Sequence, residues 1–337
     1  MANIKDIARL SGYSIGTVSR VINGRANVSE KARTRILEVI EQENYQPNAN
    51  ARLLKAVADD VILIVVKGIG NDFLVAVLER VQKELEQRRL ESTVVFLDES
   101  ANEADFAAQY VVEKRPLGIL FLGGNITFLR NNAARITVPS VLVTGDGREI
   151  GSDMISSFCC DDYAGGKMAM EYLIAHGHTE IGIIGGYPDR DSNAVVSARI
   201  AGALSVLRSH GIPFDAEKDY EPSRFSMKDG FAAGRKLLAR KKNTTAVFAL
   251  SDMIGAGVIR AAHECGLMVP SDLSLIAFDG IAYTDYTVPR ITTVRQDEVR
   301  IAADSVADLC RRINGGGPVL HEKIPCSILE KESVRSL

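Results

Sequence analysis

The chain has 337 residues, of which 46% are hydrophobic and 6% aromatic, and its formal net charge is -3 at pH 7. This length is too great for one ordinary core and predicts a small module with one or two larger domains. The N-terminus is polar and basic without a secretory signal, and the longest apolar runs are too short to span a bilayer, so a cytoplasmic protein is expected.

The cysteines and histidines show no pattern typical of a metal site or an enzyme. The five cysteines include no Cys-x-x-Cys spacing, so neither a zinc site nor a cofactor is predicted. Reduced thiols are expected, with a redox pair of the neighbours Cys159 and Cys160 as the lesser alternative. No nucleophile elbow or His-Glu-x-x-His motif is present, so no catalytic residue is predicted.

Residues 4–23 predict two short helices joined by a tight turn. Apolar side chains in the first have the spacing of an amphipathic helix, and Gly12 permits the dihedral angles that end it. Ser14 is a suitable N-cap for the second, in which Val18 and Val21 lie on one face. So short a connection matches a helix-turn-helix. Its second helix would present small or polar residues to a DNA groove, namely Ile15, Gly16, Ser19 and Arg20.

An ordinary helical hairpin is the alternative, and the next segment argues against it. Ser29 can cap a third helix that has Ala32, Ile36 and Val39 on one face. Residues 1–57 hold nine Lys and Arg against five Asp and Glu, a net charge of +4, which leaves -7 for the remainder. A basic head on an acidic body favours binding to a polyanion.

Two motifs of this region resemble the LacI/GalR family of bacterial transcription regulators. They are Lys5–Asn23 and the run Tyr45-Gln46-Pro47-Asn48-Ala49 followed by Ala51-Arg52, and the similarity continues along the body of the chain. The resemblance implies a set of DNA-binding residues: Ser14, Ile15, Gly16, Thr17, Ser19, Arg20, Asn23, Asn48, Ala51, Arg52, Leu54 and Lys55.

Residues 48–55 contain good helix formers, yet a helix this short is marginal by itself in water. The resemblance implies a hinge helix that pairs with its symmetry mate in the minor groove and wedges Leu54 into the central base step. Apolar wedges of this kind kink DNA. Asn50 departs from the small apolar residue usual in the family, so weaker or more polar packing between hinges is expected. A plain linker is the alternative.

From residue 61 onward, apolar runs typical of buried strands alternate with helical patterns. Two successive blocks of this kind predict two doubly wound parallel-sheet lobes. The predicted strands are Val61–Val66, Thr93–Leu97, Gly118–Leu122, Val141–Thr144, Ile181–Gly185, Ala246–Leu250 and Leu275–Phe278. The predicted helices are Phe73–Arg88, Asp105–Lys114, Asp162–His176, Ser197–Ser209, Met227–Arg240 and Gly255–Cys265.

The predicted organisation is an all-α helix-turn-helix headpiece at 1–46, a hinge and linker at 47–60, and an α/β core at 61–337. The resemblance implies a core similar to periplasmic sugar-binding proteins, in which Thr293–Ile313 returns to the first lobe. The first lobe is then expected at about 61–161 plus 293–320. The second is expected at about 162–292 plus 321–337.

Ligands of open α/β sheets bind beyond the carboxyl ends of the strands. The polar residues that follow the predicted strands include Asp146, Ser251, Asp252 and Asp279, although Asp252 is equally well placed to cap a helix. The resemblance implies effector-binding roles for Arg199, Phe225 and Asp279. It also places Asn71, Asp72 and Phe73 where the first lobe closes over the ligand, although Phe73 suits the core as well.

The leading hypothesis is a sequence-specific, DNA-binding transcriptional repressor that is controlled by a small molecule. A homodimer on a pseudo-palindromic DNA operator is expected, because residues 328–337 contain no leucine heptad typical of a tetramer. The effector is expected to be a sugar or sugar derivative, with a nucleobase or a phosphoprotein corepressor as the alternative. A solute-binding receptor is the competing class, but it would need a signal peptide and no DNA-binding head.

Overall fold

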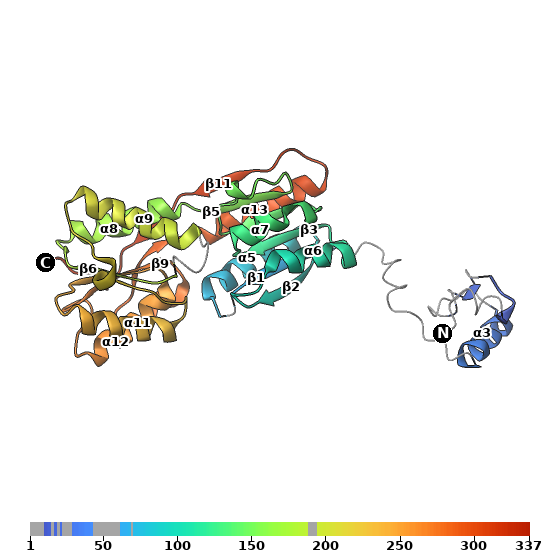
Figure 1. The fold of residues 1–337 in the computed structure, drawn as a ribbon, viewed down its shortest axis with the longest axis horizontal. Coiled ribbons are helices and arrows are strands. Elements are labelled where there is room, and N and C mark those ends of the chain that lie inside the picture. The colour runs from blue at the N-terminus through green and yellow to red at the C-terminus, as the bar shows by residue number, and fades with distance from the viewer. Residues whose placement is uncertain are drawn as a thin grey trace. The chain divides into compact units, whose positions relative to one another are not determined.

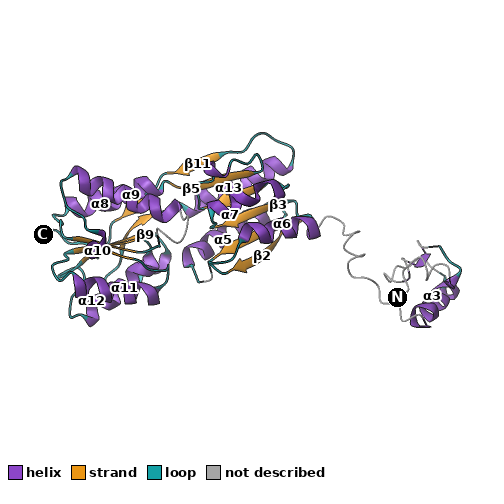
Figure 2. Ribbon diagram, in the orientation of Figure 1, coloured by secondary structure: helices purple, strands orange, loops and turns teal. Residues whose placement is uncertain are grey.

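The computed structural model describes residues 10–14, 17–18, 21, 29–42, 61–68, 70–187 and 194–337 (Figures 1 and 2). Contacts divide the chain into two compact units, Met1–Asp59 and Asp60–Leu337. Within the described residues, no helix combines the length and apolar character needed to cross a membrane.

The described part of the first unit contains two N-capped helical segments. Ser14 Oγ accepts a hydrogen bond of 3.2 Å from the amide of Thr17, which confirms Ser14 as a cap. Ser29 Oγ accepts one of 3.4 Å from the amide of Ala32 at the start of α3 (Glu30–Gln42). Val18 and Ile36 are fully buried, so both segments contribute to an apolar core.

The first lobe of the second unit is a six-stranded sheet in which every pairing is parallel. Its strand order is β11-β5-β4-β3-β1-β2. Alternate residues of β1 pack in two separate clusters, one with α5 and α13 and the other with α6 and α7, so helices cover both faces. The elements are β1 Val61–Lys67, α5 Asp72–Gln87, β2 Glu91–Leu97, α6 Glu103–Lys114, β3 Gly118–Leu122, α7 Ile126–Asn132, β4 Ser140–Val143, β5 Ile155–Cys160, α13 Glu298–Ile313 and β11 His321–Ile324.

The second lobe repeats this architecture, as Figure 2 shows, with strand order β12-β10-β9-β8-β6-β7. All its pairings are parallel except that of β12 with β10. Helices α8 and α9 cover one face, and α11 and α12 cover the other. The elements are α8 Asp162–Ala175, β6 Ile181–Ile184, α9 Ala194–Ser209, α10 Ala216–Asp219, β7 Tyr220–Glu221, α11 Met227–Arg240, β8 Ala246–Ala249, α12 Asp252–Glu264, β9 Ser274–Asp279, β10 Thr292–Arg295 and β12 Ser327–Leu329.

The chain passes between the lobes three times. The first crossing follows β5 at Asp161, the second joins β10 to α13 through residues 296–297, and the third joins β11 to β12 through residues 325–326. Two expected lobe boundaries are therefore wrong. Thr292–Arg295 pairs with β9 and stays in the second lobe, and His321–Ile324 pairs with β5 in the first. The sequence of β11 hides this pairing, because its exposed Glu322 and Lys323 lack the apolar pattern of a buried strand.

Candidate functional site

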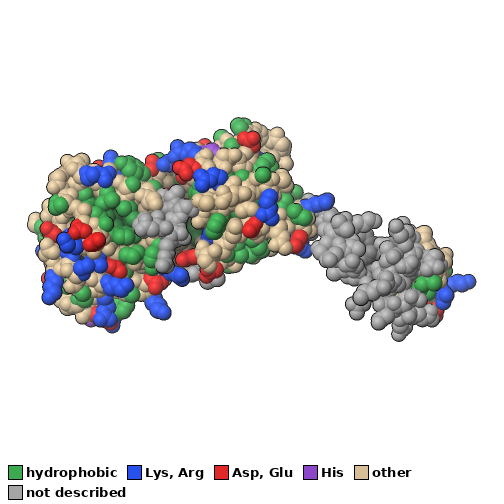
Figure 3. All heavy atoms as spheres, viewed as in Figure 1, with side chains coloured by type: hydrophobic (Ala, Val, Ile, Leu, Met, Phe, Trp, Pro, Cys, Tyr) green, Lys and Arg blue, Asp and Glu red, His purple; other side chains and the backbone are tan. Residues whose placement is uncertain are grey.

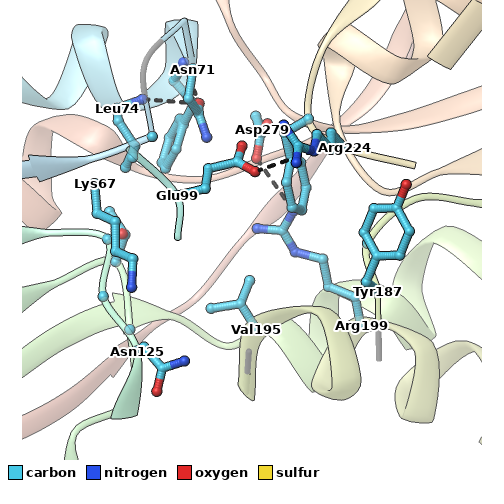
Figure 4. Close-up of a pocket in the computed structure, with 18 of the residues that line it drawn as sticks. Lys67, Asn71, Leu74, Glu99, Asn125, Tyr187, Val195, Arg199, Arg224 and Asp279 are labelled. Atoms are coloured by element: carbon cyan, nitrogen blue, oxygen red, sulfur yellow. Dashed lines mark hydrogen bonds and ion pairs between the residues drawn. The ribbon is translucent and has the colours of Figure 1, made fainter. Parts of the chain in front are cut away.

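A cavity of about 150 Å³ lies at the carboxyl ends of both sheets, where parallel α/β folds bind ligands. Figure 4 shows side chains from the two lobes on its opposing walls. In the first lobe, the lining residues end β1, follow β1, β2, β3 or β4, or lie on α5. In the second lobe, they follow β6, β7 or β10, end β9, or lie on α9. Its polar and aromatic lining residues are Lys67, Asn71, Phe73, Glu99, Asn125, Thr144, Tyr187, Arg199, Ser223, Arg224, Phe225, Asp279 and Gln296.

Arg199, on α9, is the buried cation of the second-lobe wall, with 4% of its surface exposed. Its Nε donates a hydrogen bond of 2.8 Å to Asp162, and its Nη1 donates one of 2.6 Å to the carbonyl oxygen of Leu250. The guanidinium carbon lies 3.6 Å from the centre of the Phe278 ring, a stacking distance at which the ring also attracts the charge. These contacts hold the side chain in one orientation before any ligand arrives.

Asp279 ends β9 and lies beside Arg199, whose Nη1 approaches its Oδ1 to 3.5 Å. Gln296 Nε2 donates a hydrogen bond of 2.7 Å to the same oxygen. The backbone of Asp279 has φ 116°, a left-handed value that a side chain rarely adopts. Thr144, at the end of β4 in the opposite wall, has φ 74°. Such strained residues gather at functional sites, and here one lies in each lobe's wall.

Burial dominates the electrostatics of this wall. It raises the pKa of Asp279 to about 6, although Arg199 and Gln296 oppose the shift. Burial likewise raises the pKa of Asp162, against the opposing charge of Arg199. For Arg199, burial disfavours the charge, but the carboxylates of Asp162 and Asp279 outweigh it and the pKa rises. The guanidinium therefore stays charged between two carboxyl groups.

Two glycines bring α8 and α9 into backbone contact beneath Arg199. A Cβ atom on Gly166 would lie 2.0 Å from the carbonyl oxygen of Arg199, and one on Gly202 would lie 2.1 Å from that of Tyr163. Both distances are far below a permitted contact, so only glycine allows the helices to approach this closely. The contact fixes the backbone of Arg199 against the helix that carries Asp162.

The first-lobe wall is held by a buried ion pair and two helix caps. Lys67 Nζ lies 2.6 Å from Oε2 of the fully buried Glu103 and 4.8 Å from the centre of the Phe128 ring. Asn71 caps α5 by accepting from the amides of Phe73 and Leu74. The side chain of Asn125 caps α7, and the backbone amide of Asn125 donates a hydrogen bond to the carboxylate of Glu103. The amide groups of both asparagines are thereby oriented by the helix ends.

An ion pair joins the two walls. Arg224 Nε, from the loop after β7, lies 4.0 Å from Oε2 of Glu99, which follows β2 in the other lobe. Figure 4 shows this pair across the cavity from Asn125. Both side chains are substantially exposed, so the attraction is weak and can yield when the lobes move.

Charges at the cavity are balanced among the described residues. Lys67, Arg199 and Arg224 line it together with the carboxylates of Glu99 and Asp279. Each of these cations lies within 4.0 Å of a carboxylate, and two of the partners, Glu103 and Asp162, lie behind the lining. Three cations thus meet four carboxyl groups, and no positive charge is in excess. The same part of the chain contains no cluster of three His, Cys, Asp or Glu side chains suited to a metal ion.

Five of the nine predicted effector residues line the cavity, namely Asn71, Phe73, Arg199, Phe225 and Asp279. The other four are not among the lining residues, and each has a structural role in the described chain. Asp72 begins α5, Asp146 pairs with Arg148 and lies near Lys323, and Ser251 caps α12. Asp252 is fully buried and accepts hydrogen bonds of 2.8 Å from the amide of Ile281 and 2.6 Å from Oγ1 of Thr293.

Sequence reasoning missed several lining residues, namely Lys67, Glu99, Asn125, Thr144, Tyr187, Arg224 and Gln296. Most of them lie within a few residues of a strand's carboxyl end, so the criterion of position that favoured Asp279 would also have identified them. Gln296 follows β10, a strand that was not predicted separately. The glycines at 123–124 and 186 also line the cavity.

Among the predicted DNA-binding residues, the structure describes Ser14 and Thr17, whose hydroxyls lie 3.0 Å apart. The others lie outside the described residues: Ile15, Gly16, Ser19, Arg20, Asn23, Asn48, Ala51, Arg52, Leu54 and Lys55. On the face of the core visible in Figure 3, acidic and basic side chains are interspersed. That face is not the basic patch that nucleic acid binding requires.

Comparisons with known proteins match both units. Residues 3–48 match the model of bacterial regulatory proteins of the lacI family, and residues 170–334 match a periplasmic binding protein-like domain. The transcriptional regulator MalR of Clostridium butyricum is 33% identical over 98% of each chain. The ribose operon repressor of Haemophilus influenzae is 30% identical over 93% of this chain and 92% of the relative.

Solved structures agree with these matches. The complex of transcriptional regulator CelR with cellobiose has a TM-score of 0.72 and 25% identity, and covers 99% of this chain and all of the other. The Lac repressor dimer bound to operator and the anti-inducer ONPF also has a TM-score of 0.72, with 23% identity and 99% of each chain covered. The latter similarity concerns the fold alone.

Proposed function

The chain belongs to the lacI family of bacterial regulatory proteins, and from this premise we propose that it is a repressor controlled by a neutral polyhydroxy ligand, such as a sugar, in the cavity between its lobes. As a member, it is a DNA-binding regulator of transcription with a helix-turn-helix headpiece. The relatives named above are regulators rather than enzymes.

The charge balance of the cavity is the observation that carries the choice of ligand. A phosphate group needs unpaired cations, whereas Lys67, Arg199 and Arg224 each lie beside a carboxylate. Sugar hydroxyls both donate and accept hydrogen bonds, which suits the carboxylate of Asp279 and the guanidinium of Arg199. Phe73 and Phe225 add apolar surface for the faces of a sugar ring. Ribose and cellobiose, named for two relatives, are neutral carbohydrates.

We further propose that the repressor is a homodimer on a pseudo-palindromic operator. Val75 on α5 and Phe96 on the edge strand β2 are exposed apolar residues on neighbouring elements of the first lobe. Such an apolar edge is suited to a second copy of the chain. A twofold dimer then presents two headpieces to two half-sites. Sedimentation at micromolar concentration is expected to show a dimer, and a stable tetramer would contradict it.

Ligand and DNA are coupled, in this proposal, through the angle between the lobes. A ligand that touches both walls favours one angle, and in a dimer this changes the spacing of the segments at residues 47–60. A marginal helix in that segment is the element that such a change would order or melt. The coupling free energy expected for this kind of control is about 1–3 kcal/mol.

A thermal-shift screen of the full-length protein tests the ligand class. Neutral sugars, sugar phosphates and nucleosides are compared at millimolar concentration, since a ligand that binds only the folded state raises the melting temperature. A neutral sugar is expected to raise it, and D279N to remove the rise while D146N keeps it. If only sugar phosphates or only nucleosides bind, the proposed ligand class is wrong.

DNA binding is then measured on an operator selected from genomic fragments. The sugar that raises the melting temperature is expected to change the affinity of wild-type protein for this operator, by about 5- to 150-fold. D279N should bind the operator as wild type does without the sugar and should lose the response. Equal affinity of wild-type protein with and without the sugar would contradict the coupling.

A further inference from the structure

Two cysteines meet where the chain passes between the lobes. Cys160 is the last residue of β5, directly before the first crossing, and Cys326 lies in the third crossing. Ile324, two residues before Cys326, pairs in parallel register with Cys160. Figure 1 shows β5 and β11 side by side on the approach to the second lobe. Both cysteines then pack in the same apolar cluster, with residues of α8 and α9.

The side chain of Cys326 lies beside the segment that carries Cys160. Cys326 Sγ lies 3.9 Å from the carbonyl oxygen of Asp161, the residue next to Cys160, and a Cβ atom on Gly165 would lie 3.1 Å from it. The neighbouring thiol of Cys326, together with burial, raises the pKa of Cys160, and the nearby Cys160 thiol lowers the pKa of Cys326. Cys326 is also half-buried, whereas Cys160 is only 1% exposed, so oxidants reach Cys326 first.

The neighbour Cys159 does not share this arrangement. Successive side chains of a strand point to opposite faces of the sheet, so Cys159 and Cys160 point apart. Cys159 instead pairs in register with Lys323 of β11, and burial raises the pKa of the Cys159 thiol to about 12. The alternative of a redox pair between Cys159 and Cys160 is therefore not favoured by the structure. Cys160 has its thiol partner in the third crossing.

We infer that Cys160 and Cys326 form a reversible disulfide bond when the protein meets a peroxide. In the first step, the Cys326 thiolate attacks one peroxide oxygen; the S–O bond forms, the O–O bond breaks, and hydroxide leaves. In the second step, Cys160 sulfur attacks Cys326 sulfur; the S–S bond forms and the S–O bond breaks, and the leaving hydroxide takes the Cys160 proton. Two thiols are oxidised, and one hydrogen peroxide is reduced to two waters.

The bond would link the first crossing covalently to the third. The lobes can rotate only if the three crossing segments twist relative to one another, and β5 and β11 are already paired up to residues 160 and 324. A bond from Cys160 to Cys326 extends this attachment beyond the sheet, into the segments that must twist. Oxidation is therefore a modification that stiffens the joint between the lobes. Formation of the bond does not depend on the proposed ligand.

The experiment treats the purified full-length protein with hydrogen peroxide at near-equimolar concentration, alkylates the remaining thiols, and maps the peptides by mass spectrometry. The expected product is a peptide pair joined through Cys160 and Cys326, with two fewer alkylated thiols per chain. Dithiothreitol should restore both thiols. C159A and C310A are matched controls, since each removes a thiol from the same lobe's elements and should leave the cross-link intact.

C160A and C326A should each abolish the cross-link, and circular dichroism checks that they fold. In C160A, Cys326 should stop at sulfenic acid, which a dimedone label detects and which does not depend on a partner thiol. A pair joined through Cys159, or peroxide treatment that leaves all five thiols alkylatable in the folded wild type, would overturn the inference. So would equal dimedone labelling of Cys326 and the exposed Cys265 in C160A, because Cys326 would then have no special reactivity.

Discussion

Gln296 and Asp279 are joined by a side-chain hydrogen bond of 2.7 Å, and the backbone amide of Gln296 also donates to the backbone carbonyl oxygen of Asp279 at 3.1 Å. Gln296 lies in the second crossing between the lobes and is 2% exposed, so it has little freedom to move alone. The cavity carboxylate is thus attached to the segment that must twist when the lobes rotate. This attachment gives a ligand at Asp279 a direct route to the angle between the lobes.

Removing Arg199 should destabilise the core much more than removing an exposed arginine. R199A leaves the buried carboxyl groups of Asp162 and Asp279 without their cation, which typically costs about 3–5 kcal/mol. R148A breaks the partly exposed pair with Asp146 and should cost no more than about 1 kcal/mol. Denaturant unfolding monitored on the core measures both losses. Similar losses would mean that the Arg199 network adds no more than a surface pair.

The raised pKa of Asp279 predicts a specific dependence of stability on pH. Its pKa of about 6 exceeds the ordinary value of 3.8 for an aspartate, so the folded state binds the proton more tightly than the unfolded chain does. This group's contribution to stability therefore falls as pH rises from about 4 to 6 and is level above, a loss of about 3 kcal/mol in all. Between pH 5 and pH 7 the loss is about 1 kcal/mol.

D279N is the matched variant for this dependence, since asparagine cannot ionise and tolerates the left-handed backbone at this position. The free energy of unfolding is measured at pH 5 and pH 7 for both proteins. The wild type should lose about 1 kcal/mol more than D279N over this interval. An identical change in both proteins would show that Asp279 titrates near its ordinary value.

The cap at Ser14 predicts the effect of its removal on the headpiece. S14A leaves the amide of Thr17 without its side-chain acceptor and should destabilise the helix by about 0.5–2 kcal/mol. Hydrogen exchange in the full-length protein measures this as faster exchange of the amides of Thr17, Val18 and Val21, with no change in the core. Threonine also caps helices, so S14T is the control that should restore protection. Unchanged exchange in S14A would show that the cap is dispensable.

Arg20 lies outside the described residues, and the prediction for it rests on the helix-turn-helix pattern and the family resemblance. If Arg20 pairs with a guanine edge in the major groove, R20A should cost about 1–3 kcal/mol on the operator and little on random DNA. Competition binding at fixed salt concentration measures both affinities. Equal losses on the two DNAs would show that Arg20 contacts phosphate only.

Much of the fold could be predicted because its strands are apolar runs buried on both faces. The alternation of such runs with helical patterns located both lobes, and Gly118–Leu122 and Met227–Arg240 have the predicted bounds. The edge elements carry weaker signals. Serines interrupt the apolar pattern of β5, and β11 is charged, so neither was recognised as a strand. The error at the third crossing follows from that charged edge.

The sequence could locate site residues by their position at the end of a strand. It could not show which of two carboxylates in such positions reaches the cavity. Asp252 and Asp279 both follow or end apolar runs. Asp252 turns inward to the amide of Ile281 and the hydroxyl of Thr293, whereas Asp279 reaches the cavity. Those partners come from segments 29 and 41 residues away in the chain, so no local pattern distinguishes the two residues.

The glycine contact between α8 and α9 also governs how such a protein can diverge. Any side chain at Gly166 or Gly202 would collide with the backbone of the facing helix, so substitutions at these glycines cannot shift Arg199 in small steps. The loop residues Tyr187 and Phe225 are only partly buried and Arg224 is exposed, so these side chains tolerate replacement far better. After gene duplication, a copy could therefore acquire a new ligand preference by exchanging loop side chains around an inherited arginine.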